Sequence, residues 1–135
     1  MIYIILALIL TLFLLMSFPK ILNKLDKKVK NVSSDEAIEL IKQNKNIIIL
    51  DVRSKLEFQD GHLEGSRLIP VNELSARIND LEKFKNRPIL VYCKSGGRSP
   101  SAVRILSKNN FTQVYQLKHG LATWKGKLKK WETLF

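Results

Sequence analysis

The residues best suited to chemistry surround Cys93, the single cysteine of the sequence. The loop that follows it combines two cations, two glycines and two hydroxyl side chains: Lys94, Ser95, Gly96, Gly97, Arg98 and Ser99. Glycines let successive backbone N–H groups converge on one point, which creates a nest with partial positive charge. A thiol in such a nest, beside two formal cations, loses its proton more readily than a free cysteine and becomes a nucleophile.

The elements on either side of this loop must hold the thiol in place. The apolar residues 88–93 predict a buried strand that ends at Cys93. Ser99 is a suitable N-cap residue, and Pro100 suits the first helical position, where its missing N–H costs nothing. The sequence therefore predicts strand, loop and helix, with the sulfur at the N-terminus of the helix.

Strand and helix patterns alternate along the chain from Val29 onward. Apolar runs predict strands at residues 29–32, 47–52 and 114–117, besides 88–93, and a short strand just before Pro70. Helical patterns cover residues 34–41, 55–60, 71–85 and 99–109, the first opened by a capping box. Such alternation predicts an α/β fold with a parallel sheet, whose functional groups lie at the carboxyl ends of the strands. Asp51 and Cys93 both follow this rule.

Composition excludes several classes of protein. With 135 residues, the chain has room for one domain and an appendage. One cysteine cannot form an intramolecular disulfide, so a disulfide-built secreted scaffold is excluded and a reducing compartment is favoured. The net charge of +11 comes mostly from lysines in the two flanks, and no nucleic-acid motif accompanies them, so no nucleic-acid partner is expected. The lack of a Cys/His cluster argues against a metal site.

The N-terminal residues predict a membrane anchor. Residues 2–18 carry no charge and correspond to roughly 25 Å of helix, near the lower limit for a span. A signal peptide would begin with positive charge, and a core helix would show a polar face. We therefore expect a transmembrane anchor at residues 1–19, a basic juxtamembrane linker at 20–28 and a domain with a basic tail at 29–135. The lysines after the span place the N-terminus outside and the domain in the cytoplasm, on the inner membrane, with the lipid bilayer as a partner.

Four motifs resemble, in order and spacing, the single-domain rhodanese-like family of thiosulfate sulfurtransferases. They are Asp51-Val52-Arg53 with Glu57-Phe58, Gly61-His62-Leu63-Glu64-Gly65-Ser66 with Ile69-Pro70, the loop from Cys93 to Ser99, and Gly120-Leu121-Ala122-Thr123-Trp124. With its apolar N-terminus, the chain looks like the bacterial membrane-anchored type. The resemblance implies a five-stranded parallel sheet flanked by helices. One departure is His119, at a position where the family often has a second glycine.

The resemblance also implies a reaction and roles for particular residues. Cys93 would take a sulfane sulfur from thiosulfate or a persulfide donor and pass it to a thiol, a protein acceptor or cyanide, without a cofactor. The backbone of residues 94–99 would hold the anionic sulfur, and Lys94 and Arg98 would attract the anionic donor. Asp51, Arg53 and His62 are expected to support the surrounding loops, with Arg53 paired to Glu57.

Two other functions remain open. A membrane-tethered module could bind partners without turnover, although such modules usually lose the cysteine that this chain retains. Phosphatases and arsenate reductases of related fold also use a loop from Cys to Arg. Here four residues separate Cys93 from Arg98, fewer than in those phosphatases, and the smaller cradle suits one sulfur atom.

Overall fold

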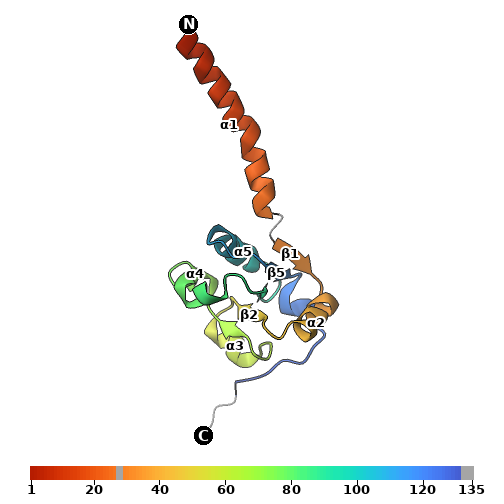
Figure 1. Cartoon of the computed structure of the whole chain (residues 1–135). Coiled ribbons are helices and arrows are strands. Elements are labelled where there is room, and N and C mark those ends of the chain that lie inside the picture. The colour runs from red at the N-terminus through yellow and green to blue at the C-terminus, as the bar shows by residue number, and fades with distance from the viewer. Residues whose placement is uncertain (27–28, 132–135) are drawn as a thin grey trace.

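Five parallel strands form the centre of the α/β body (Figure 1). The structure is a computed structural model, and it describes residues 1–26 and 29–131. The strands are β1 (Val29–Val32), β2 (Ile48–Asp51), β3 (Arg67–Leu68), β4 (Ile89–Tyr92) and β5 (Val114–Leu117). Their order in the sheet is β1-β5-β4-β2-β3, and every neighbouring pair is parallel. The predicted five-stranded parallel sheet is therefore confirmed.

Helices connect these strands close to the predicted positions. The α-helices of the body are α2 (Ser34–Gln43), α3 (Lys55–Asp60), α4 (Val71–Leu74) and α5 (Ser99–Lys108), and two 3-10 helices are η1 (Ile78–Phe84) and η2 (Gly120–Thr123). The single helix predicted over residues 71–85 is wrong, because this stretch divides into α4 and η1. The break falls at residues 75–77, where the backbone of Arg77, with a φ of −107° and a ψ of 15°, departs from α-helical geometry.

The sheet is buried on both faces. Alternate residues of β4 point to opposite sides: Ile89 and Val91 pack with α4, η1 and α5, whereas Leu90 and Tyr92 pack on the side of α2. Figure 1 shows the strands enclosed between these helices. Burial on both faces explains why the strands appear in the sequence as continuous apolar runs.

Strand register places the candidate site at one edge of this sheet. Asp51, at the end of β2, lies opposite Tyr92 at the end of β4. Because the strands are parallel, the loops that follow them leave the sheet side by side. The residues after Asp51 and the loop after Tyr92 are thus neighbours, although about forty residues separate them in the sequence.

The N-terminal helix α1 (Ile2–Asp26) extends away from the α/β body (Figure 1). Among residues 1–26 and 29–131, no helix has the length and apolar character needed to cross a membrane. The predicted transmembrane anchor is therefore wrong. So are the location in the inner membrane and the topology with the N-terminus outside. The bilayer as a partner is not supported. The physical reason is the length of the uncharged part of α1. Residues 2–18 correspond to about 25 Å of helix, which is shorter than the hydrocarbon core of a bilayer, about 30 Å.

The expected linker at residues 20–28 falls largely within α1, which continues to Asp26. Residues 27–28 and the end of the predicted tail, residues 132–135, lie outside the described residues. Before them, the chain leaves η2 in an extended path, and Lys129 forms an antiparallel bridge with His62. The tail is thereby joined to the turn after α3.

Candidate active site

Cys93 lies at the carboxyl end of β4 with its thiol inside the loop that follows. The residue is 1% exposed, and the backbone N–H of Gly96 donates a hydrogen bond to its Sγ at 3.1 Å. Gly96 has a φ of +94°, a left-handed conformation that glycine adopts without strain. The turn at Gly96 is therefore what directs an N–H back to the sulfur.

The surroundings of the thiol favour its ionised form. Burial opposes ionisation, but the backbone N–H groups of Ser99, Arg98 and Gly96, together with the Ser99 hydroxyl, lower the pKa of Cys93 below its usual range. The Ser99 hydroxyl is fully buried and has no other hydrogen-bond partner among the described residues. Helix α5 begins at Ser99 with Arg98 as its N-cap, so the prediction of Ser99 as the N-cap is wrong by one residue. Its hydroxyl is thus free for the sulfur.

Arg98 is held by a carboxylate from another element. Its Nη1 and Nη2 donate to the two carboxylate oxygens of Glu57 on α3 at 2.6 and 2.8 Å. This bidentate pair lowers the pKa of Glu57 to about 2. Ser54 caps the same helix, with its hydroxyl accepting from the Glu57 N–H at 3.3 Å. Helix α3 therefore anchors the far end of the Cys93 loop.

Arg53 pairs with Asp51, so the predicted pair of Arg53 with Glu57 is wrong. The Arg53 Nη2 lies 2.7 Å from Asp51 Oδ2 and also donates to the carbonyl of Gly61 at 2.7 Å. Both side chains are buried. Burial alone disfavours the charge on Arg53, but the hydrogen bonds and the charge of Asp51 outweigh it and raise the pKa of the guanidinium. This pair fixes the start of the loop after β2.

A clasp from η2 holds the other side of the Cys93 loop. The N–H of Leu121 donates to the Cys93 carbonyl at 3.0 Å, and that of Ala122 donates to the Lys94 carbonyl at 2.9 Å. Gly120 has a φ of +55°, and a Cβ there would overlap with the Cys93 carbonyl oxygen. The preceding His119, at the family's frequent second glycine, is also left-handed, with a φ of +61°. The motif at residues 120–124 thus acts as a backbone support for the loop.

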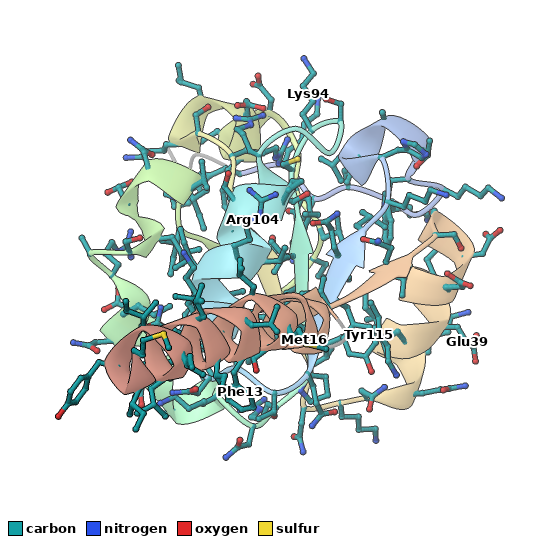
Figure 2. The ribbon with its side chains drawn as sticks, turned by 90° about the horizontal axis from the view of Figure 1, so that it is seen from above. Phe13, Met16, Glu39, Lys94, Arg104 and Tyr115 are labelled. Carbon is teal, nitrogen blue, oxygen red and sulfur yellow. The ribbon has the colours of Figure 1, made fainter. Side chains whose placement is uncertain are left out.

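An open cavity of about 390 Å³ adjoins the Cys93 loop. Its lining combines charged and apolar side chains, among them Arg53, Lys94, Ser95, Leu121, Ala122 and Leu128. Lys94 and Ser95 are exposed at its rim, and Figure 2 shows the Lys94 side chain pointing outward from the body. Lys94 forms no ion pair within the described part of the chain. It is therefore a cation available to an approaching anion.

His62 and Tyr92 have contacts that explain the turn between α3 and β3. The His62 ring stacks on Phe58 with centroids 3.8 Å apart, and its Nδ1 lies 2.7 Å from the Phe58 carbonyl oxygen. The Tyr92 hydroxyl accepts from the N–H of Leu63 at 3.1 Å and donates to the Ser66 hydroxyl at 3.2 Å. These contacts stabilise the turn, and none of them reaches the sulfur.

Glu57 and Gly120 belong to the motifs that carry the family resemblance, but the sequence did not show that they support the Cys93 loop, and it did not assign Tyr92 a role in the site. The spacing of Ser54 and Glu57 is a capping-box signal that agrees with the predicted start of α3. This capping-box signal does not indicate that Arg98 lies opposite Glu57. Within the described residues, no group of three His, Cys, Asp or Glu side chains is arranged to hold a metal ion.

Comparison with known proteins assigns the family. A model of the rhodanese-like domain matches residues 33–127. The chain belongs to the rhodanese-like family. The matched range contains the Cys93 loop, the α3 anchor and the η2 clasp, so the loop and both of these supports belong to the rhodanese-like domain. The membrane-anchored type within that family is not confirmed.

Relatives of this rhodanese-like chain include proteins with and without an assigned activity. The Bacillus subtilis protein YqhL is 41% identical over 81 residues, which cover 60% of this chain and 63% of YqhL. The thiosulfate sulfurtransferase GlpE of Coxiella burnetii is 34% identical over 96 residues, or 71% of this chain and 87% of GlpE. A rhodanese-like domain protein from Staphylococcus aureus superposes with a TM-score of 0.68 at 26% identity, covering 76% of this chain and 99% of that one. The chain thus spans less than two thirds of YqhL.

Proposed function

We propose that this rhodanese-like protein is a sulfurtransferase that carries a sulfane sulfur on Cys93. The observation that supports this most directly is the hydrogen bond from the Gly96 N–H to Sγ, 3.1 Å long, inside a loop where the N–H groups of Arg98 and Ser99 face the same sulfur. Such a loop stabilises a thiolate before the reaction and a terminal persulfide sulfur after it. Similarity to a thiosulfate sulfurtransferase over most of that protein's length agrees with this role.

The proposed reaction has two displacement steps. In the first, the Cys93 thiolate attacks the outer sulfur of thiosulfate, the S–S bond of thiosulfate breaks, and sulfite leaves with the electron pair. With a persulfide donor, a thiolate leaves instead. In the second step, a thiolate or cyanide attacks the outer sulfur of the Cys93 persulfide, and Cys93 leaves as a thiolate. The chain contains no second cysteine, so the acceptor must come from outside.

The two cations of the loop have different parts in this proposal. Lys94 is exposed at the rim of the cavity, where it attracts the dianionic donor. Both terminal nitrogens of Arg98 are engaged by Glu57, so its charge is largely balanced within the protein. We therefore assign donor attraction to Lys94, and to Arg98 a positioning role for the loop.

The same ion pair argues against phosphatase or arsenate reductase chemistry. In that chemistry an arginine of the loop must bind the oxygens of a tetrahedral oxyanion in a bidentate manner. The Glu57 carboxylate already occupies that face of Arg98, and only four residues lie between Cys93 and Arg98. Both features favour a single sulfur as the cargo.

A persulfide test examines the proposal directly. Freshly reduced protein is incubated with thiosulfate, freed of excess reagent and weighed intact by mass spectrometry. We expect a gain of one sulfur atom per chain, reversed by cyanide with release of thiocyanate. Cys93→Ser, with the same fold and one atom changed, is the matched control and should gain nothing.

Two results would contradict the proposal. If the wild-type protein gains no sulfur from either thiosulfate or a small-molecule persulfide, the chain is better described as a partner-binding module without turnover. If Cys93→Ser gains the same mass, the sulfur is attached elsewhere and Cys93 is not the carrier.

A further inference from the structure

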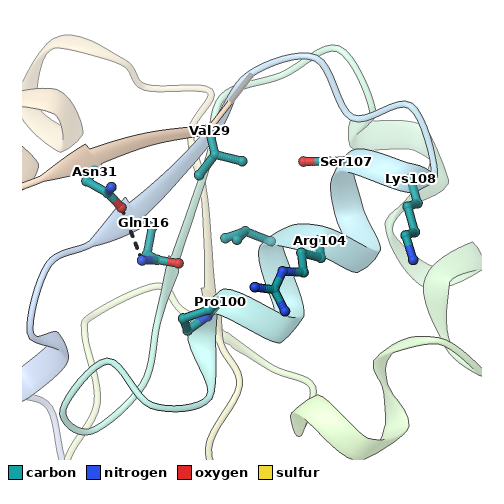
Figure 3. Close-up of a pocket in the computed structure, with 8 residues that line it drawn as sticks. Val29, Asn31, Pro100, Arg104, Ser107, Lys108 and Gln116 are labelled. Carbon is teal, nitrogen blue, oxygen red and sulfur yellow. Dashed lines mark hydrogen bonds between the residues drawn. The ribbon is translucent and has the colours of Figure 1, made fainter. Parts of the chain in front are cut away.

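A second hollow lies away from the Cys93 loop, between α5 and the strands β1 and β5 (Figure 3). Its volume is about 330 Å³, within the range of small-molecule sites. Strand β1 is at the edge of the sheet, so the layer of helices on this face ends at α5. The hollow is the space left beside that last helix.

Two buried polar atoms in this hollow have no hydrogen-bond partner among the described residues: Ser107 Oγ and Gln116 Oε1. Ser107 is only 6% exposed. The Gln116 side chain is fixed from its other end, because its Nε2 donates to Asn31 Oδ1 at 3.1 Å. Its carbonyl oxygen is thereby turned toward the hollow, and Figure 3 shows the Ser107 hydroxyl pointing into the same space. Buried polar groups are normally paired, so these two atoms indicate a missing partner.

The charge of the hollow is positive. Arg104 and Lys108, one turn apart on α5, both line it, and neither forms an ion pair within the described part of the chain. Figure 3 shows the Arg104 guanidinium directed toward Gln116. No carboxylate is among the described lining residues. An anionic group therefore suits this end of the hollow.

The remaining walls are apolar. Val29, Pro100 and Val103 present hydrocarbon surface to the space between the polar groups. From these three features, we infer that the hollow is a binding site for a small organic carboxylate that carries a neutral hydroxyl or amide donor and a short hydrocarbon part. The carboxylate contacts Arg104, the donor reaches Gln116 Oε1 or Ser107 Oγ, and the hydrocarbon part lies against the valines.

The donor must be neutral because of its surroundings. A ligand ammonium group would approach Gln116 Oε1 next to the Arg104 guanidinium, where like charges repel. A hydroxyl or amide N–H makes the same hydrogen bond without this repulsion. The need for a neutral donor, together with the need for an anionic group, defines the class of ligand more narrowly than the volume of the hollow does.

Titration of the ¹⁵N-labelled full-length chain, followed by amide chemical shifts, tests the inference. The probe is 2-hydroxy-3-methylbutanoate, which has a carboxylate, a neutral hydroxyl and an isopropyl group. We expect saturable shifts confined to α5, β1 and β5. Arg104→Gln should weaken binding at least tenfold, and Ser107→Ala several-fold. Lys42→Gln on α2 removes one exposed helical cation elsewhere and is the matched control, so it should leave the affinity unchanged.

Comparison probes decide the chemical class. The uncharged 2-hydroxy-3-methylbutanamide and inorganic phosphate should each bind at least tenfold more weakly than the carboxylate. Equal binding of the amide would overturn the anionic requirement, and equal binding of phosphate would overturn the need for a donor and a hydrocarbon part. The lack of any saturable shift, or unchanged affinity in Arg104→Gln, would overturn the site itself. Cys93→Ser should bind the probe normally, which separates this inference from the proposed sulfur transfer.

Discussion

At the scale of single residues, a few hydrogen-bond donors determine how readily the thiol of Cys93 ionises. Burial raises the free energy of the thiolate, whereas the N–H groups of Ser99, Arg98 and Gly96 and the Ser99 hydroxyl lower it by more. The donors prevail because several of them converge on one atom. A buried cysteine without such donors would instead have a raised pKa and low reactivity.

This balance predicts the pH dependence of Cys93 alkylation. The rate of reaction with iodoacetamide should rise with pH and reach half its maximum below about 8.5, the ordinary midpoint for a free cysteine. Ser99→Ala removes a donor from the buried side of the sulfur and should move the midpoint upward. Ser95→Ala changes an exposed hydroxyl of the same loop and should leave the midpoint in place. A wild-type midpoint at or above that of free cysteine would contradict the proposed stabilisation of the thiolate.

The pair of Glu57 and Arg98 predicts an effect on acid stability. The pKa of Glu57 falls from 4.5 to about 2 on folding, so its contribution is complete above about pH 4.5 and is lost as the pH falls toward 2. Both side chains are partly exposed, and solvent screening limits this contribution to about 1 kcal/mol. Urea unfolding should show Glu57→Gln less stable than wild type at pH 7 by about that amount, with the gap closing near pH 2. A gap independent of pH would contradict the assignment.

At the scale of elements, the Cys93 loop is positioned by contacts from three directions. Strand β4 leads into it, α3 binds Arg98 through Glu57, and η2 supplies two N–H groups to the loop carbonyls. The close approach of η2 requires glycine at position 120, because any side chain there would meet the backbone of Cys93 and Lys94. Rigid support of this kind is what keeps donors aimed at the sulfur.

Substitution of Gly120 tests this support. Gly120→Ala combines a left-handed φ of +55° with a Cβ that would lie 2.8 Å from the Lys94 carbonyl carbon. We expect a loss of at least about 3 kcal/mol in the free energy of unfolding, together with slower persulfide formation. Gly65→Ala is the matched control: its φ of +76° brings similar strain, but no atom lies within 4 Å of the new Cβ. It should cost only about 1–2 kcal/mol. Equal losses in the two variants would show that contact with the Cys93 loop is unimportant.

At the scale of the whole molecule, the described apolar side chains of α1 lie apart from the core of the α/β body. Among the side chains that the structure describes, which leave out residues 18–28, both hydrophobic clusters are built from residues after position 28, and the large apolar side chains from Met1 to Met16 are more than half exposed. The stability of the body therefore depends on the sheet and its covering helices. The exposed apolar side chains from Met1 to Met16 add nothing to that core.

A truncated chain tests this separation. Residues 29–135 should unfold in urea with a free energy within about 0.5 kcal/mol of the full-length value, since none of the described core contacts is removed. The truncated chain should also acquire the persulfide at the full-length rate. Leu74 is fully buried, so Leu74→Ala is the reference for the loss of a core contact, and it should lower the free energy of unfolding by about 2–5 kcal/mol. A loss of similar size on truncation would mean that α1 packs on the body after all.

The sequence by itself determined most of the sheet and the identity of the reactive loop. Strands β1 and β5 and helix α3 have the predicted bounds, and β2 and β4 lie within one residue of theirs at each end. These features are encoded locally, because an apolar run or a glycine-rich turn restricts its own residues whatever lies around it. The family motifs likewise needed only order and spacing.

Tertiary structure decided the partners. Two arginines could pair with Glu57, and Arg53 is the nearer of them in the sequence. The register of β2 with β4 instead brings Arg98 to Glu57, and Arg53 pairs with Asp51. The close packing of Gly120 on Cys93 and the hollow beside α5 also arise from segments distant in the chain. The interaction energy of two charged side chains depends on the distance between them in space. For residues far apart in the sequence, that distance is set only when the sheet is assembled.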